Sequence, residues 1–331
     1  MLLAALVVVG VLAGTIALER AALVRSLSLL AHVDWTWVLA ALAAELASMG
    51  AFARAQRRLL SVGGARLGLA SVLAVTYAGN AIAVTIPLAG SAASVAFVFG
   101  QYRRRGVDPV LVSWALVVTG LASSCTFALL LATGALATGS LLPAALGLAG
   151  AGLSLVPFAA VLAARRSPRV HRVVRAVLLA LVSRLERLTR RSLPDPARAF
   201  DSVLARLTAI TVTRRRYAQV FGLALSNWVA SWLCLAFAVL ATGSRVPWGG
   251  LLLAYGAGAG VGIVPFTPGG LGVVELTLSA ALVVAGLNAS HALAAVLLFR
   301  LLSFWLVMVI GWLVTVLLNR VHGGDRGPAR A

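Results

Sequence analysis

The sequence predicts an all-α polytopic membrane protein, and its composition, the length of its apolar runs and the placement of its charges each indicate this. Hydrophobic residues make up 61% of the 331 residues and charged residues 11%, and the mean hydropathy is +1.00. A soluble domain carries roughly 25% charged residues because water covers its surface. The apolar runs are long enough for helices that cross about 30 Å of hydrocarbon. We therefore expect one integral membrane domain over residues 1–320 and a short cytoplasmic tail over residues 321–331.

Apolar runs mark the expected membrane elements. Six full spans are predicted at about 1–18, 35–53, 110–132, 141–163, 218–242 and 292–318. The first of these has no basic region before it, so we interpret it as a retained helix. Two longer apolar stretches, 69–100 and 250–286, contain proline and glycine near their centres, around Pro87–Gly90 and Pro265–Gly270. Because proline lacks a backbone N–H, each stretch is predicted to be a broken pair of helices.

Arginine clusters predict how these stretches cross the membrane. All 28 basic residues are arginine, and most lie between apolar runs, where the positive-inside rule places them in the cytoplasm. Clusters follow the 35–53 run, the 69–100 stretch and the 141–163 run. All of them share one side only if 69–100 and 250–286 are re-entrant hairpins that enter from opposite sides. Both termini are then cytoplasmic. Ordinary helices kinked by proline are the alternative.

Two broken hairpins of opposite orientation, one in each half of the chain, are typical of transporters built from inverted repeats. No repeat is visible residue by residue, so the inverted repeat is a hypothesis from hydropathy. Residues 165–216 are predicted to form a cytoplasmic basic amphipathic segment, with valine and leucine at helical spacing and arginine between them. Such a segment lies in the headgroup layer and attracts anionic lipids. A linker held at the membrane by its charge is the alternative.

Several function classes are excluded or disfavoured by the same composition. The formal charge of +19 is explained by loop arginines, so we expect no nucleic-acid partner. The absence of lysine excludes Schiff-base chemistry and the lysine of a P-loop. Cys125 and Cys234 lie in apolar runs, and the four histidines are scattered, so we expect no metal and no cofactor. No recognisable catalytic set is present, and we do not expect an enzyme.

The run from residue 263 to 279, IVPFTPGGLGVVELTLS, is the most informative motif. Its prolines are expected to end one half-helix, and Thr267 to cap the next, with Pro268 at the first helical position. Gly269, Gly270 and Gly272 leave the backbone there uncovered, so another group could approach closely. A helix N-terminus inside the membrane offers unpaired N–H groups and about half a positive charge, which suits a phosphate. Close helix packing at the glycines is the alternative.

Three charged side chains fall inside apolar stretches. Glu275 is predicted about two turns into the second half-helix, Arg300 within the last span, and Glu45 within the 35–53 span. An isolated charge at that depth costs at least about 2.5–3.5 kcal/mol, so each needs a partner. We expect Glu275 and Arg300 to pair or to share a polar cavity, with Glu45 a candidate for the same cavity. An ion pair that only locks the hairpin to the last helix is the alternative. Weaker polar candidates, each expected to make a helix–helix hydrogen bond, are Tyr77, Asn80 and Asn227.

The block TPGGLGVVE, followed by LLFRLLSFWLVMVIGW from Leu297, resembles a known family. It is similar to the flippase-like integral membrane family, which comprises the transmembrane domain of lysylphosphatidylglycerol synthases and its stand-alone relatives. The resemblance covers roughly residues 30–320 and is strongest from about 250 onward. In the first half, Ser91–Ala92–Ala93 stands where relatives would carry a more charged motif. The matching positions are Pro268, Gly269, Gly270, Leu271, Gly272, Glu275 and Arg300, with Trp305 close behind.

The resemblance implies a multi-pass protein that translocates phospholipids, or lipids bearing an added group, between leaflets of the cell membrane. In the fused synthases a soluble domain adds lysine to the lipid. Only a short tail follows the last span here, so aminoacyl transfer is not expected. We expect an anionic or modified headgroup to meet the helix start at Gly269–Gly270, moving downhill or coupled to ions because no ATP motif is visible.

Other functions and partners remain open at this point. The first rival is a secondary transporter for a small polar solute. The second is an intramembrane enzyme acting on lipid-linked sugars, which would need Glu45 and Glu275 to converge. The third is a non-catalytic membrane partner of a lipid- or glycan-modifying enzyme. Membrane phospholipids are the expected partners, and a homo-oligomer or a complex with a lipid-modifying enzyme is compatible with the sequence.

Overall fold

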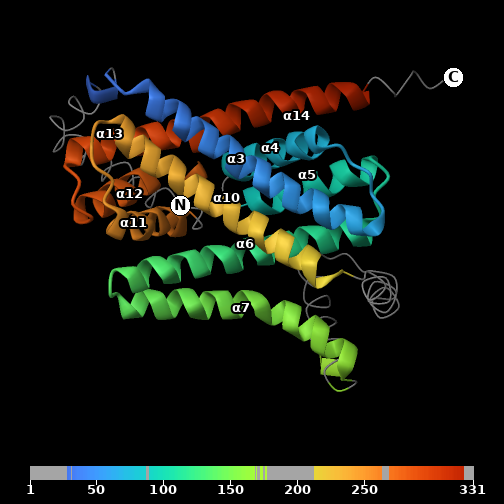
Figure 1. Ribbon diagram of the computed structural model, residues 1–331. Helices are drawn as coiled ribbons and strands as arrows, with labels where there is room; N and C mark the ends of the chain where they lie inside the picture. The colour runs from blue at the N-terminus through green and yellow to red at the C-terminus, as the bar shows by residue number, and fades with distance from the viewer. Residues whose placement is uncertain are drawn as a thin grey trace, which may run out of the picture.

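The computed structural model describes residues 28–30, 32–86, 89–167, 169, 172–173, 176, 212–262 and 268–323, and every regular element within them is helical (Figure 1). The prediction of an all-α fold is therefore confirmed. The long helices are α3 (Trp35–Leu60), α4 (Leu69–Thr85), α5 (Gly90–Arg104), α6 (Pro109–Ala137), α7 (Leu141–Arg166), α10 (Arg214–Ala241), α11 (Trp248–Gly262), α12 (Val273–Val284), α13 (Ala289–Arg300) and α14 (Val307–Gly323).

Three short elements join these helices: the 3-10 turns Ser61–Gly63 and Pro268–Gly270, and the π-helix Leu301–Leu306 between α13 and α14. The expected span at 1–18, Thr267, most of the amphipathic segment at 165–216 and the end of the tail lie outside the described residues.

Polar side chains at the helix starts explain several boundaries. Asp34 accepts a hydrogen bond from the Thr36 N–H at the start of α3. Asp108 accepts from two backbone N–H groups at the start of α6, where Pro109 occupies the first position. Thr213 and Asn288 cap α10 and α13 in the same way. Each cap satisfies a backbone donor that the helix itself leaves unpaired.

The centre of the molecule is the antiparallel pair α3 and α10 (Figure 1). At one end the Asp34 N–H donates to the Ala241 carbonyl at 3.0 Å. At the other end Arg58 Nη1 donates to Gln219 Oε1 at 2.7 Å. Buried alanines along both helices allow their backbones to approach closely, as is usual in membrane bundles. Helix α4 contacts α3 and helix α11 contacts α10, so this pair touches both hairpins.

Helices α4 and α5 form one hairpin and α11 and α12 the other, each packed as a pair. The four helices have 17, 15, 15 and 12 residues. At 1.5 Å per residue none of them reaches the roughly 30 Å that a straight span requires. In Figure 1 the outer ends of α4 and α5 lie to the right, and those of α11 and α12 to the left. The hairpins therefore enter from opposite ends, as the arginine pattern predicted.

One end of the molecule collects most of the described arginines, and we call it the arginine-rich end. It comprises the last turns of α3, α5 and α14, the first turn of α10 and the loop after α3 (Figure 1). Its arginines are Arg54, Arg57, Arg58, Arg66, Arg103, Arg104, Arg105, Arg214, Arg215, Arg216 and Arg320. Arg245, in the loop before α11, lies at the opposite end. This charge asymmetry matches the positive-inside pattern of a multi-pass membrane protein.

The outer surface of the described helices is apolar. Within the described residues, four stretches are long and apolar enough to cross a membrane: Trp35–Gly63, Pro109–Ala137, Arg214–Ala241 and Ala289–Leu318. Their outward faces, together with that of α7, expose large hydrophobic side chains, among them Leu39, Leu129, Leu146, Leu153, Leu313 and Leu317. A soluble surface rarely exposes so much contiguous apolar area. The protein is therefore a multi-pass membrane protein.

The packing of the hairpins supports the inverted-repeat hypothesis. Helix α4 of the first half packs against α14 of the second half. Reciprocally, α11 of the second half packs against α6 of the first half. These two contacts are equivalent if α3, α4 and α6 correspond to α10, α11 and the α13–α14 segment. Such an exchange agrees with two inverted halves.

Candidate functional site

The break between α11 and α12 differs from the predicted helix start. We expected Thr267 to cap the next helix, with Pro268 at its first position. Pro268 instead lies in a separate 3-10 turn, and α12 begins only at Val273, with Gly272 as its N-cap. The first helix ends at Gly262, and Thr267 lies outside the described residues.

Three glycines cause this delayed start. Gly269, Gly270 and Gly272 have φ angles of 60°, 71° and 82°. Such left-handed conformations cannot continue a right-handed helix, and residues with a Cβ rarely adopt them. A side chain at Gly269 would also collide with the Phe304 ring. The glycines therefore serve a tight left-handed turn that lies against the last helical segment.

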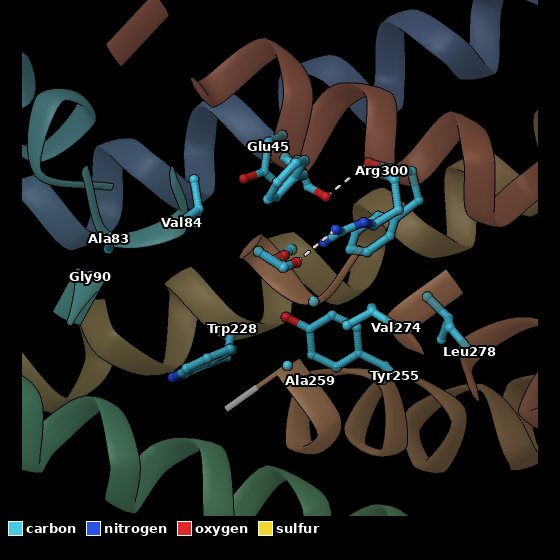
Figure 2. Close-up of a pocket in the computed structure, with 18 of the residues that line it drawn as sticks. Glu45, Ala83, Val84, Gly90, Trp228, Tyr255, Ala259, Val274, Leu278 and Arg300 are labelled. Atoms are coloured by element: carbon cyan, nitrogen blue, oxygen red, sulfur yellow. Dashed lines mark hydrogen bonds between the residues drawn. The ribbon is translucent and has the colours of Figure 1, made fainter. Parts of the chain in front are cut away.

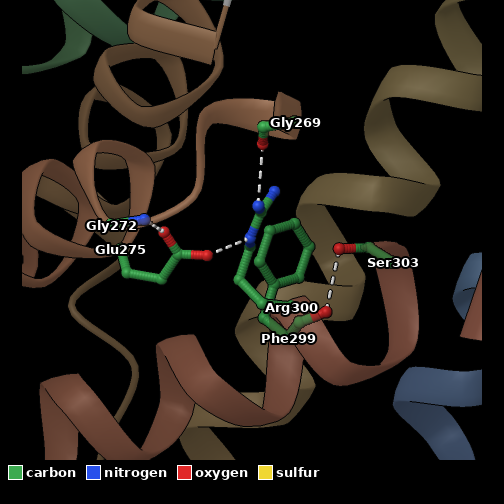
Figure 3. Close-up of polar contacts among 6 residues, drawn as sticks. All are labelled: Gly269, Gly272, Glu275, Phe299, Arg300 and Ser303. Carbon is green, nitrogen blue, oxygen red and sulfur yellow. Dashed lines mark hydrogen bonds and ion pairs between the residues drawn. The ribbon is translucent and has the colours of Figure 1, made fainter. Parts of the chain in front are cut away.

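Glu275 lies in the first turn of α12, and not about two turns into it as predicted, because the helix starts late. Its Oε2 accepts a hydrogen bond from the Gly272 N–H at 2.7 Å. Its Oε1 accepts from Arg300 Nε at 2.6 Å (Figure 3). The carboxylate therefore caps its own helix, and it is the anion at the helix start where we had expected a phosphate.

Arg300 joins the last helices to the hairpin tip. Besides Glu275, its Nη2 donates to the Gly269 carbonyl at 2.9 Å (Figure 3). Its guanidinium lies over the Phe304 ring, 4.0 Å from the centroid. The side chains of Arg300 and Glu275 are only 10% and 15% exposed. The predicted pairing of these two charges is present in the structure.

The chain after Arg300 is a π-helix, Leu301–Leu306. Short π-helical insertions are rare and often mark functional sites, because they displace the helix face and interrupt its hydrogen bonding. Here the insertion places Ser303 and Phe304 beside Arg300, and the Ser303 hydroxyl donates to the Phe299 carbonyl at 2.8 Å. The sequence motif did not predict this π-helix.

A cavity of about 630 Å³ lies beside these groups (Figure 2). We call it the larger cavity, because it adjoins a smaller one of about 250 Å³. The first hairpin contributes Ala83, Val84, Ile86, Gly90 and Ser91. The second contributes Tyr255, Gly258, Ala259, Gly269, Gly270 and Val274. Arg300 and Glu45 complete the polar part of the wall. Both hairpin tips thus meet around one space in the middle of the bundle.

Glu45 reaches the larger cavity from α3 (Figure 2). It is 6% exposed, and the Ser231 hydroxyl of α10 lies beside its carboxyl group. Its Oε2 has no hydrogen-bond partner among the described residues. The structure therefore brings Glu45 and Arg300 to one cavity, as predicted, while the Glu275 carboxylate contacts Arg300 from behind the wall.

The larger cavity reaches the molecular surface beside the first hairpin tip. Ile86 and Ser91 line it, and Ile86 is 39% exposed. The neighbouring Val95 of α5 is 55% exposed. These exposed side chains lie between the two ends of the molecule.

Sequence reasoning missed several residues of the wall. Trp228 and Tyr255 lie in an aromatic group with Phe127 and Phe299, and aromatic side chains in membrane helices carry no distinguishing pattern. Ser231 and Ser303 were detectable, because they follow the polar residues Asn227 and Arg300 by four and three positions on the same helix face.

Two of the three weaker polar candidates, Asn227 and Asn80, make the predicted helix–helix hydrogen bond, whereas Tyr77 is found in an apolar contact. The Ser48 hydroxyl of α3 donates to Asn227 Oδ1 of α10 at 3.0 Å, which is the predicted helix–helix hydrogen bond. Asn80 Nδ2 contacts the Met49 sulfur at 3.8 Å, and Tyr77 packs with Met49 and Val307. These contacts tie α4 to α3 and to α14.

Comparison with known proteins agrees with this architecture. A UPF0104 membrane protein of Pyrococcus horikoshii, PH1989, is 28% identical over 149 residues, which are 45% of this chain and 43% of the relative. The chain thus matches less than half the length of that relative. The family model for the lysylphosphatidylglycerol synthase TM region matches residues 1–311, nearly the whole chain. The chain therefore belongs to the family of the lysylphosphatidylglycerol synthase TM region.

Proposed function

We propose that the protein is a lipid translocase that moves phospholipid or modified-lipid headgroups across the bilayer through the larger cavity. The observation that supports this proposal is the meeting of two opposed hairpins around one cavity, whose wall includes Arg300, Glu45 and exposed residues of the first hairpin. A non-enzymatic role is part of the proposal: Arg300, held in place by Glu275, contacts the headgroup without chemistry on the lipid.

The energetic task of such a site is to replace water around a headgroup in the middle of the membrane. Polar groups in hydrocarbon cost several kcal/mol each unless they find partners. The larger cavity supplies a guanidinium at Arg300, a carboxyl at Glu45 and hydroxyls at Ser91, Ser231 and Tyr255. The acyl chains would remain in lipid at the rim formed by Ile86 and Val95.

The proposed orientation places the arginine-rich end in the cytoplasm, following the positive-inside rule. The protein would then lie in the cell membrane, with both termini cytoplasmic. Its ligands would be membrane phospholipids with anionic or modified headgroups, and it would act as a homo-oligomer or beside a lipid-modifying enzyme.

The test is a lipid-movement assay on purified protein in vesicles of phosphatidylcholine with a trace of fluorescent, acyl-labelled phosphatidylglycerol. A membrane-impermeant quencher reports how much labelled lipid reaches the outer leaflet. The parent protein should move the labelled lipid, and Arg300→Gln and Glu275→Gln should each lower the rate at least tenfold. Arg245→Gln, in an exposed loop at the opposite end, is the matched control and should retain the parent rate.

The outcomes separate the rival functions. Loss of movement in both site variants, with the fold intact by circular dichroism and size exclusion, supports headgroup passage at this site. If the parent moves none of the tested phospholipids, the proposal fails. The better hypothesis for the function is then a secondary transporter for a small polar solute, or a non-catalytic membrane subunit.

A further inference from the structure

A smaller cavity of about 250 Å³ adjoins the larger one. Glu45, Trp228, Ser231 and Ser303 line both cavities, so they form the boundary between them. The smaller cavity adds four polar side chains to the wall: Ser48, Asn80, Ser123 and Asn227. Glu45 is thus the acidic group at the junction of two spaces, one of which is lined by hydroxyls and amides.

The smaller cavity extends from Glu45 toward the arginine-rich end. Along α3 its wall passes from Glu45 to Ser48 and Phe52, in the direction of Arg54. Along α10 it passes from Ser231 back to Asn227, in the direction of the first turn of that helix. Nine residues separate Glu45 from Arg54, which is about 13 Å of helix. The polar residues Ser48 and Asn227 therefore lie on the arginine-rich side of Glu45, beside apolar residues such as Phe52.

Among the described residues, no free cation lies beside Glu45. The titratable groups within electrostatic range are Tyr77 of α4, Cys234 of α10 and Tyr255 of α11, which are neutral near neutral pH in their ordinary forms. Helix α6 contributes only an uncharged hydroxyl, Ser123, to the described wall. Arg300 shares the larger cavity, but its guanidinium is bonded to Glu275 and Gly269. An ionised carboxylate here would be buried without a counter-ion, whereas a protonated carboxyl group avoids that cost.

We propose that Glu45 is a proton-binding site that receives its proton from the arginine-rich end through the smaller cavity and thereby sets the charge of the larger cavity. The proposal rests on the translocase function above and names its coupling ion. Glu275 and Arg300 cancel one another, so the net charge of the site is zero with the proton on Glu45 and −1 without it. An anionic headgroup is repelled by the second state, so the headgroup and the proton occupy the site together and move together.

The first test detects the proton on the Glu45 carboxyl group directly and does not depend on lipid movement. Infrared spectra of the parent at neutral pH, taken as a difference from the spectrum in alkaline buffer, should show the band of a protonated buried carboxyl group. The band should disappear in Glu45→Gln, remain in Glu275→Gln, and persist at a shifted position in Glu45→Asp. A parent spectrum without that band, or a band that survives in folded Glu45→Gln, overturns the proposal.

The second test measures how the rate of lipid movement depends on pH. It uses vesicles with equal pH on both sides and labelled phosphatidylglycerol as the probe. The parent rate should fall with rising pH, by up to about tenfold per pH unit once Glu45 ionises. The rate of Glu45→Gln, whatever its size, should not change with pH, and Arg245→Gln should follow the parent. A parent rate that depends on sodium but not on pH assigns Glu45 to a metal cation and overturns the proton site.

The failures of the two proposals are distinguishable. If no phospholipid moves at any pH, the translocase proposal fails, while the infrared band still decides whether Glu45 binds a proton. If lipid moves at a rate that is independent of pH in the parent, the translocase stands and the coupling is overturned.

Discussion

The two hairpins line the same cavity, yet they are held in different ways. The tip between α11 and α12 is held by a buried ion pair, three glycines with positive φ and a neighbouring π-helix. The tip between α4 and α5 carries no charged residue, and it closes by placing Gly90 against the Ala83 carbonyl. A hairpin tip of this fold therefore does not require an ion pair, and under the proposed function Glu275 and Arg300 have a second role besides holding the hairpin.

The largest effect on stability and lipid movement is expected when one charge is removed from the second hairpin. Arg300→Ala leaves Glu275 without its cation, which should destabilise the protein by about 3–5 kcal/mol and abolish lipid movement. Thermal unfolding in detergent and the vesicle assay measure the two effects. Arg245→Ala, at an exposed loop position, should change neither.

A double variant separates structure from function at the same pair. Glu275→Gln combined with Arg300→Met removes both charges, so most of the stability lost in Arg300→Ala should return. Lipid movement should stay at background. A double variant that moves lipid at the parent rate would show that the pair only locks the hairpin. The second hairpin would then have no functional role that the first lacks.

The second-largest effect is expected at the glycine turn. Gly269→Ala places a side chain at φ 60° and against Phe304, which should cost about 1–3 kcal/mol and displace the carbonyl that Arg300 contacts. Gly260→Ala, on α11 of the same hairpin, has open space around the new methyl group and is the matched control. Unfolding midpoints that are equal for the two variants would contradict the strained turn.

The first hairpin should respond to a packing change alone. Gly90→Ala drives a methyl group toward the Ala83 carbonyl, which should cost about 1–2 kcal/mol through overpacking. Gly100→Ala, on the same helix with nothing close by, should be neutral or slightly stabilising. Lipid movement should fall less in Gly90→Ala than in Gly269→Ala, because no ion pair depends on Gly90. The reverse order would reverse the roles assigned to the hairpins.

The smallest effect is expected between the central helices. Ser48→Ala removes the hydrogen bond to Asn227, and such bonds between membrane helices average about 0.6 kcal/mol. The unfolding midpoint should shift only slightly, with no change in the contact between Arg300 and Glu275. A loss as large as that of Gly269→Ala would show that the α3–α10 pair depends on this bond.

Most of the fold was predictable because apolar run length, helix breakers and arginine placement act locally or through the membrane. The starts of α6 and α13 follow from Asp108, Pro109 and Asn288, and the hairpin breaks follow from proline and glycine. The pairing of Glu275 with Arg300 followed from the cost of isolated charge in hydrocarbon. These rules need no knowledge of tertiary contacts.

The remaining details depend on contacts that the sequence does not display. Glycine adopts either sign of φ, so the left-handed turn at Gly269 and the late start of α12 could not be predicted from residue type. The π-helix after Arg300 is set by how that segment packs, and the aromatic wall formed by Trp228 and Tyr255 resembles ordinary core.

The most direct test of the central claim is to block the opening of the larger cavity. Ser91→Cys places a thiol at the exposed rim, while the native Cys125 and Cys234 are buried. Labelling with a bulky maleimide should then stop phosphatidylglycerol movement in vesicles, and labelled Ser113→Cys, exposed on α6 away from the cavity, should retain the unlabelled rate. Full movement through labelled Ser91→Cys protein would contradict passage of the headgroup through this cavity.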